Sequence, residues 1–264
     1  MSSRGLLFLC VVLLLASPAL GYDYFALAIQ WGPSYCKVYG CSPYGDIRRW
    51  TIHGLWPTTI VQPYPAYCTD VTYSAAAISS IEGQLRTWWP SYSAGNDHNA
   101  FWEYEFEKHG SCSMSHAQLN TQYKYFERTL NLHSTYSVAT VLANAGIVAS
   151  DTKAYTLTQI TNAFNSQWGV VPDFDCSTTG GKSYLVEIRP CFDKANLKPL
   201  NCGSLSTSDV AIEHPKEHHL ISGPRVAQIQ ALKDLVAERI GEQQPKPEAT
   251  LGACSSTFYI AYAY

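Results

Sequence analysis

The chain has 264 residues, of which 46% are hydrophobic and 15% are charged. Apolar side chains are numerous enough for a sizeable core, so the composition excludes a largely disordered protein, and the length suits one large domain. The 18 Lys and Arg residues are outnumbered by 21 Asp and Glu residues. This balance disfavours a protein that binds nucleic acid through a broad basic surface, although it leaves room for a local phosphate site.

The N-terminal segment has the pattern of a secretory signal peptide. Arg4 precedes an apolar run over residues 6–15, and the small residues Ala19 and Gly21 follow where a cleavage site is expected. The run is too short for a membrane-spanning helix, which needs about 20 residues. We therefore expect a signal peptide at 1–21, a mature chain at 22–264 without membrane attachment, and a location outside the cell or in the endolysosomal or vacuolar lumen.

The cysteines agree with export. Eight of the nine remain after loss of the signal peptide, and an even number in an exported chain indicates four disulfides. A zinc site of paired cysteines is disfavoured, because the sequence has no Cys-x-x-Cys pair. The spacing alone leaves the pairing open. The eight cysteines are Cys36, Cys41, Cys68, Cys112, Cys176, Cys191, Cys202 and Cys254.

Hydrophobic periodicity predicts strands at both ends of the mature chain and helices mainly between them. The segment 242–250 is a local loop rather than a domain boundary. We expect one α+β domain, with a central, mainly antiparallel sheet flanked by helices and stapled by disulfides. In chain order, the pattern predicts a strand at 24–31, a strand at 48–57, helices at 74–89, 99–110, about 118–130 and 157–168, a strand at 182–192, a helix at 224–241 and a strand at 258–264.

The stretch FWEYEFEKHGSC (101–112) combines aromatic and ionisable residues on one predicted helix. Residues four apart share a helix face, so Glu105 lies with His109, and Tyr104 with Lys108. The four side chains therefore form one patch of proton donors and acceptors. The rings expected to anchor the other side of the helix are Phe101, Trp102 and Phe106.

Such a patch suits phosphoryl chemistry. The imidazole of His109 exchanges a proton near neutral pH, and the ammonium of Lys108 balances charge on a phosphorane. Cleavage of RNA by its own 2′-OH needs a base for that hydroxyl and an acid for the 5′-oxygen, so one histidine is insufficient. The candidate partner is His53, in TIHGLWP. Alone, a Glu/Lys/His helix face is more often a solvated surface and a strand histidine a core residue. The presence of both segments in one chain, each with a Trp and a Gly beside its histidine, favours a catalytic site over these structural roles.

Both segments resemble the active-site signatures of the ribonuclease T2 family of secreted and vacuolar or lysosomal acid ribonucleases. WTIHGLWP (50–57) is similar to the first signature, and FWEYEFEKHGSC is similar to the second. The QW pair of ALAIQWGPSYC and the segment RPCFDKANLKPLNC also match in order. The resemblance implies an α+β fold and cleavage of single-stranded RNA through a 2′,3′-cyclic phosphate, with no metal and no cofactor.

By position in the signatures, the resemblance makes His109 the general base that activates the 2′-OH. It makes His53 the general acid that protonates the leaving 5′-oxygen. Glu105 and Lys108 match residues that stabilise the transition state. No protein partner is implied besides the RNA substrate, and we expect a monomer.

The resemblance also implies substrate contacts by Tyr104, Trp56 and Gln30. Tyr104 departs from the family, which commonly has a third histidine at this position, thought to bind phosphate. A phenol donates a hydrogen bond but brings no positive charge. We expect an active enzyme that holds phosphate more weakly.

A set of disulfides follows from the same resemblance. Cys68–Cys112 would tie the loop after the first signature to the end of the second. The other implied pairs are Cys36–Cys41, Cys176–Cys254 and Cys191–Cys202.

Two alternatives remain open. His214 and His218, in EHPKEHH, are four apart and could bind zinc on a helix, but Pro215 weakens a helix there. The other alternative is a catalytically impaired secreted protein that binds receptors or RNA without turnover. Its support is Tyr104, whereas the presence of two proton carriers argues against it.

Overall fold

The computed structural model describes residues 21–41, 46–60, 64–93, 95, 97–202 and 252–263. Apart from Gly21, the expected signal peptide lies outside these ranges. So do the helix expected at 224–241, the loop at 242–250, and the residues His214 and His218.

A sheet of nine strands forms the centre of the described part of the chain, and every printed pairing except that of β5 with β9 is antiparallel. Strand β1 pairs with β2 along one edge and with β5 and β6 along the other, and β5 also pairs with β4. The strands are β1 (Tyr24–Trp31), β2 (Trp50–Thr58), β3 (Ser150–Thr156), β4 (Asp173–Thr179), β5 (Lys182–Arg189), β6 (Cys191–Asp193), β7 (Pro199–Leu200), β8 (Gly252–Ala253) and β9 (Thr257–Ile260).

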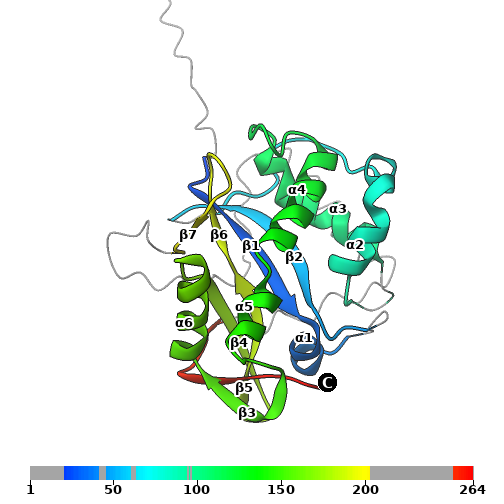
Figure 1. The fold of residues 1–264 in the computed structure, drawn as a ribbon. Helices are drawn as coiled ribbons and strands as arrows, with labels where there is room; N and C mark the ends of the chain where they lie inside the picture. Colours follow the sequence, from blue (N-terminus) through cyan, green and yellow to red (C-terminus); the bar gives the residue numbers. More distant parts are fainter. Residues whose placement is uncertain are drawn as a thin grey trace, which may run out of the picture.

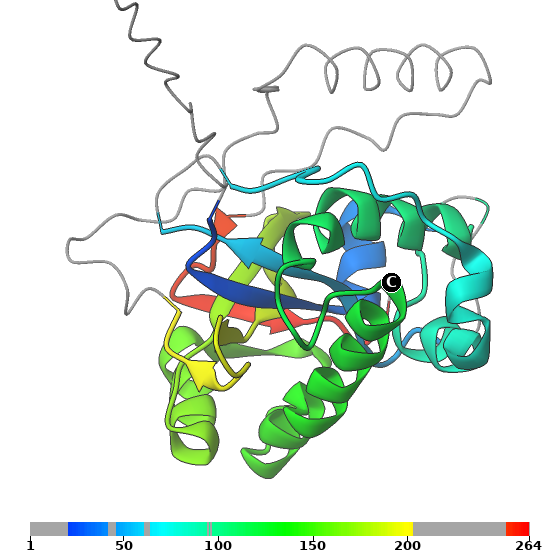
Figure 2. The same ribbon diagram turned by 90° about the horizontal axis from the view of Figure 1, so that it is seen from above.

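Helices cover both faces of this sheet. Seen from above, α1 lies on one side, and α4 and α6 lie on the other (Figure 2). Helices α2, α3 and α4 gather beside β2 (Figure 1). The expected α+β class with a mainly antiparallel sheet is confirmed. The helical segments are α1 (Gly32–Tyr39), η1 (Ala75–Ile81), α2 (Glu82–Trp88), α3 (His98–Lys108), η2 (Gly110–Ser113), α4 (Gln122–Thr135), α5 (Val138–Asn144) and α6 (Leu157–Trp168).

The hydrophobic core lies between the sheet and helices α4 to α6. Phe25, Leu27 and Ile29 of β1 alternate onto this face, where they join Phe126 of α4 and Phe164 of α6. Burial of each such side chain contributes about 1.5–3 kcal/mol. The core therefore fixes β1 and β2 as a rigid base for the signature residues.

Two elements agree with the sequence pattern to the residue. These are the strand at 24–31 and the helix at 157–168, whose start is set by a capping box of Thr156 and Gln159. The expected strand at 182–192 is interrupted at Pro190, which has no N–H to pair. Pro190 still accepts a hydrogen bond of 2.9 Å from the Leu27 amide, so β6 continues along β1.

Other elements differ from expectation. The predicted strand at 24–31 is followed directly by helix α1, which no prediction covered; it begins at Gly32 and Pro33, because proline is well suited to the first turn of a helix. The helix expected at 74–89 is η1 followed by α2. Helix α5 and strands β3 and β4 had no clear periodicity, since β3 and β4 are rich in Ser, Thr and Asp.

Candidate active site

His53 is the extra residue of a β-bulge. In the pairing of β1 with β2, Ala28 lies opposite Gly54 and Ile29 lies opposite Ile52, so His53 has no partner on β1. As a result Ile52 and Leu55, three residues apart, both enter the hydrophobic core. A bulge redirects the side chain of its extra residue and is frequent beside active sites. Here the imidazole is 25% exposed and lies between two carboxylates.

The sheet face opposite the hydrophobic core carries a buried polar row. Thr51 of β2 pairs with Gln30 of β1, Gln30 pairs with Glu187 of β5, and Glu187 pairs with Asp175 of β4. All four are buried. Gln30 therefore stands inside the sheet between two polar neighbours, not on the open surface. Buried polar groups need partners within the protein, and here Thr51 bonds Tyr92 while Glu187 bonds His53.

Glu187 holds one edge of the His53 ring. Its Oε2 lies 2.8 Å from Nδ1 of His53, and its side chain is 2% exposed. The carboxylate accepts the proton of Nδ1, so the other nitrogen, Nε2, faces the remainder of the site. The indole of Trp89 donates to the carbonyl oxygen of His53 at 2.7 Å and fixes the backbone of the bulge.

Glu105 reaches the site from α3. Its side chain is 1% exposed, and its Oε1 lies 3.7 Å from Nε2 of His53. The indole of Trp56 donates a hydrogen bond of 2.9 Å to the other oxygen, Oε2. Burial raises the pKa of Glu105, while His53, the Trp56 hydrogen bond and Lys108 oppose this rise. A Cβ at Gly54 would clash with both Glu105 Oε2 and Trp56 Nε1, so only glycine fits there.

His109 ends α3. Its backbone amide donates to the Glu105 carbonyl oxygen at 3.0 Å, and its ring contacts the Trp56 indole, with 5.3 Å between ring centroids. The His53 ring contacts the same indole at 5.1 Å. Burial lowers the pKa of His109 well below its ordinary value, and the charges of Lys108 and His53 lower it further. The two imidazoles thus flank one indole and differ in charge environment.

Tyr104 and Lys108 lie on the exposed side of α3. The Lys108 ammonium donates a hydrogen bond of 2.7 Å to the Tyr104 hydroxyl, and the phenol ring is 44% exposed. The predicted patch of four side chains is therefore split, because Glu105 is buried under it. Phe101 was expected on the other side of the helix, yet its ring stacks on His53 at 5.9 Å, so that expectation was wrong.

Four disulfides are present, with the pairing that the resemblance implies. Cys68–Cys112 joins the loop after β2 to η2, three residues beyond His109. Around it, the amide of Tyr67 donates to the Lys108 carbonyl oxygen at 2.8 Å, and the amide of Cys68 donates to the Ser111 hydroxyl at 2.9 Å. The end of α3 is thus fixed by one covalent and two hydrogen bonds.

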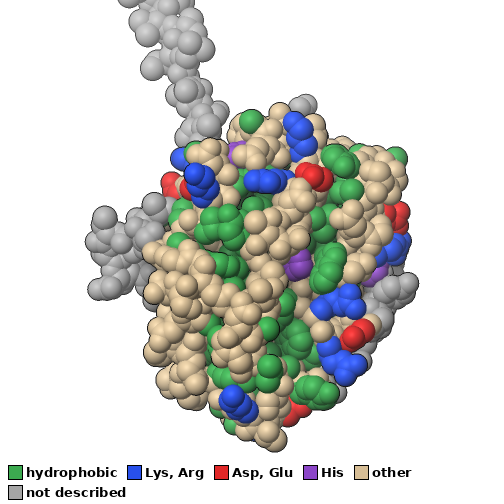
Figure 3. Space-filling model, viewed as in Figure 1, with side chains coloured by type: hydrophobic (Ala, Val, Ile, Leu, Met, Phe, Trp, Pro, Cys, Tyr) green, Lys and Arg blue, Asp and Glu red, His purple; other side chains and the backbone are tan. Residues whose placement is uncertain are grey.

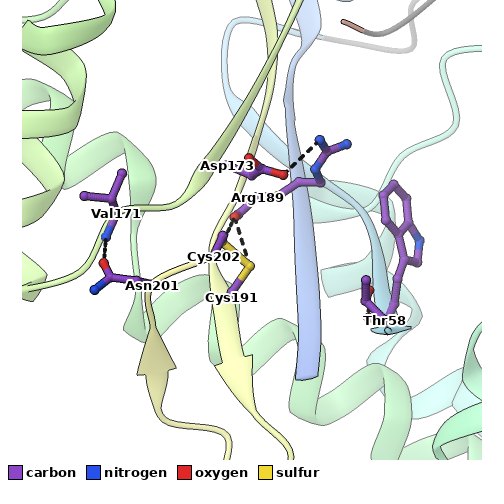
Figure 4. The surroundings of a disulfide bond; sticks show 8 residues. Thr58, Val171, Asp173, Arg189, Cys191, Asn201 and Cys202 are labelled. Atoms are coloured by element: carbon purple, nitrogen blue, oxygen red, sulfur yellow. Dashed lines mark hydrogen bonds and ion pairs between the residues drawn. A yellow bond between two sulfur atoms is a disulfide. The ribbon is translucent and has the colours of Figure 1, made fainter. Parts of the chain in front are cut away.

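Arg189 follows Glu187 on the same sheet face. The Arg189 guanidinium contacts Asp175 and lies 3.4 Å from Glu187 and 3.4 Å from Asp173. Figure 4 shows this guanidinium directed to Asp173, with the Cys191–Cys202 disulfide beside the Arg189 carbonyl group. Sequence reasoning missed Glu187 and Arg189. The available signal was that VEIR places two charged residues in a strand that is otherwise buried.

The described residues contain no group of three His, Cys, Asp or Glu side chains placed to hold a metal ion. Within the same ranges, no helix has the length and apolar character that crossing a membrane requires. On the face seen in Figure 3, Lys and Arg side chains are scattered among apolar and neutral side chains.

The arrangement combines three chemical capacities. The ring of His109, whose pKa burial lowers, can accept a proton. The ring of His53 lies between two carboxylates, an arrangement that favours a charged imidazole, and the Lys108 ammonium stands nearby. Pairs of titratable groups whose environments separate their protonation states are typical of acid–base catalysis.

Comparison with known proteins gives consistent matches. The model of the Ribonuclease T2 family matches residues 22–202. Ribonuclease DdI of Dictyostelium discoideum is 32% identical over 184 residues, covering 70% of this chain and 79% of the relative. The crystal structure of human RNase T2 has a TM-score of 0.60 at 26% identity and covers 69% of this chain and 91% of its own. The structure of RNase NT in complex with 5′-AMP has a TM-score of 0.63 at 27% identity, covering 71% and 93%.

Proposed function

The chain belongs to the ribonuclease T2 family, and we propose from this premise that it is an endoribonuclease for single-stranded RNA. The reaction is attack of the 2′-OH on the adjacent phosphorus, which breaks the bond to the 5′-oxygen and leaves a 2′,3′-cyclic phosphate. We propose that the side chains of the protein catalyse this reaction without a metal ion or a cofactor. The supporting observation is that His53 and His109 contact the same indole, with Glu105 beside it.

His109 is the base. Burial lowers its pKa, which favours the neutral ring that can take the proton of the 2′-OH. His53 is the acid. Carboxylates at 2.8 Å and 3.7 Å favour its charged form, so it can give a proton to the leaving oxygen.

Lys108 and Glu105 stabilise the transition state, in which charge grows on the phosphorane oxygens. Tyr104 donates a hydrogen bond to a phosphate oxygen from the exposed side of α3, next to the Lys108 ammonium. Trp56 and Gln30 support the substrate site through Glu105 and through the polar row. The rate follows a bell-shaped pH profile with a mildly acidic optimum, since acid and base need opposite protonation states.

The setting follows from the sequence. The expected signal peptide and the four disulfides support an enzyme that is secreted or held in an endolysosomal or vacuolar lumen, and we propose that it acts as a monomer. The structure of RNase NT with 5′-AMP supports a nucleotide-binding site in a relative.

The test is incubation of the purified chain with single-stranded RNA, with and without a chelator, and mass spectrometry of the product ends. We expect cyclic-phosphate ends from the wild type in both conditions and none from His53→Phe. Loss of cleavage on chelation would contradict a metal-independent enzyme. RNA binding without cleavage by the wild type would favour the impaired binding protein instead.

A further inference from the structure

We propose that Glu187 is a positioning residue for RNA cleavage: its carboxylate keeps the proton on Nδ1 of His53 and so directs Nε2 at the leaving oxygen. The inference rests on the proposed function, and it assigns a residue that lies outside both signature segments.

Geometry carries the proposal. Glu187 Oε2 lies 2.8 Å from Nδ1 and is nearly inaccessible to water. Because His53 occupies a bulge, no ladder pairing with β1 orients it, and the ring is fixed by its side-chain contacts. On the opposite edge, Nε2 is turned to Glu105 at 3.7 Å. A ring rotated by half a turn would lose the 2.8 Å bond and would place the carbon Cε1 where Nε2 now lies, so it could not donate a proton there.

A buried cation lies beside Glu187. Arg189 lies 3.4 Å from Glu187 Oε1 and is itself buried. Burial raises the pKa of its other partner, Asp175, to about 7, although the Arg189 charge opposes this rise. Asp175 contacts the same guanidinium, so Glu187 and Asp175 share one buried positive charge. Asp173, the outer contact at 3.4 Å, is 38% exposed.

The charged groups around His53 come from two elements, β5 and α3. Glu187 lies on β5, Glu105 lies on α3, and Lys108 and His109 stand at the end of α3. Of these, Glu187 is the group in hydrogen-bond contact with Nδ1. Its removal should thus change the acid in the reaction and leave the base unchanged.

The experiment compares wild type with Glu187→Gln on two substrates: an oligoribonucleotide and a nucleoside 3′-(p-nitrophenyl phosphate). The second has a leaving group so acidic that it departs without a proton. For RNA we expect kcat to fall at least tenfold and the alkaline limb of the pH profile to move down by about one unit, since an opposite charge has been lost. For the activated ester we expect rates within about twofold of wild type. That second rate also shows that the variant is folded.

The control is Asp173→Asn, which removes a carboxylate from the same Arg189 cluster without contact to His53. Its profile should match wild type. Equal losses of Glu187→Gln on both substrates, or no loss on either, would overturn the proposal. A separate readout is the ¹⁵N resonance of the His53 ring, which should report a protonated Nδ1 in wild type and a lower protonation midpoint in Glu187→Gln. This readout tests the role of Glu187 even if the wild type cleaves no RNA, which would instead contradict the proposed function.

Discussion

The indole of Trp56 donates a hydrogen bond of 2.9 Å to Glu105 Oε2 and contacts the rings of both His53 and His109. A single aromatic side chain thus supports the buried carboxylate and separates the two imidazoles. Because Glu105 is almost fully buried, this donor and nearby positive charges must keep it ionised.

Replacement of Trp56 by Phe removes the donor and keeps an aromatic ring. A hydrogen bond to a charged group contributes about 1.5–3 kcal/mol, so its loss destabilises the ionised form of Glu105. Its pKa rises, so the carboxylate is lost at a higher pH. We expect the acidic limb of the kcat/KM profile to move upward. An unchanged limb would show that Glu105 ionisation does not limit cleavage.

Gly54→Ala, a substitution in β2, tests the same hydrogen bond between Trp56 and Glu105. The added Cβ would clash with Glu105 Oε2 and Trp56 Nε1, so the hydrogen bond must open. We expect a loss of at least about tenfold in kcat, measured on RNA, from one methyl group. The matched control is Gly83→Ala in α2, where a Cβ meets open space. That variant should keep full activity and gain up to about 1 kcal/mol in unfolding free energy.

Tyr104→His should strengthen the hold on phosphate. A charged hydrogen bond exceeds a neutral one by about 1 kcal/mol, which is several-fold in rate or affinity. The new imidazole would stand beside the Lys108 ammonium, since that group lies 2.7 Å from the present hydroxyl. Repulsion favours the neutral ring, so the gain is expected only in acidic solution. Tyr104→Phe should lower activity at every pH, and equal kinetics for all three chains would contradict the phosphate role.

His109 links stability to pH. Its folded-state pKa lies well below the unfolded value of 6.5, so the unfolded chain binds the proton more readily. Its contribution is therefore present above pH 6.5 and is lost as the pH falls. Relative to His109→Gln, wild type should lose unfolding free energy as the pH falls from 7 to 5. Urea unfolding at both pH values measures this, and parallel losses in the two chains would refute it.

The Cys68–Cys112 disulfide closes a separation of 44 residues. Chain entropy gives it a stabilisation of about 4 kcal/mol, and it also fixes the end of α3 next to His109. We expect the Cys68→Ser, Cys112→Ser double variant to lose that stability and to show a reduced kcat. The matched control removes Cys36–Cys41, which spans five residues and contributes about 2 kcal/mol without contact to the site.

The sequence predicted those features that depend on neighbouring residues within one helix or strand. The spacing of Glu105, Lys108 and His109 places them at one end of α3, and helix 157–168 carries its own capping signal. Glu187 could not be found in this way. It lies 134 residues from His53, and only the pairing of β1 with β5 brings it within 2.8 Å.

The sequence also could not predict which face of the sheet each residue of β2 occupies. In WTIHGLWP, strict alternation would place Ile52 and Leu55 on opposite faces. Both are core residues because the bulge changes the alternation at His53, and such an irregularity depends on the partner strand. Phe101 was misplaced for a similar reason, since its neighbour is a residue of another element.

The extra residue in β2 means that the position of the His53 ring depends on the number of residues in the strand as well as on their identity. A chain shortened by one residue there could retain both histidines, both tryptophans and the glutamate, and still direct its imidazole away from the phosphate, because a shift of one exchanges the two faces of a strand. Among relatives with intact motifs, the length of this strand should therefore separate those able to cut RNA from those that only resemble nucleases.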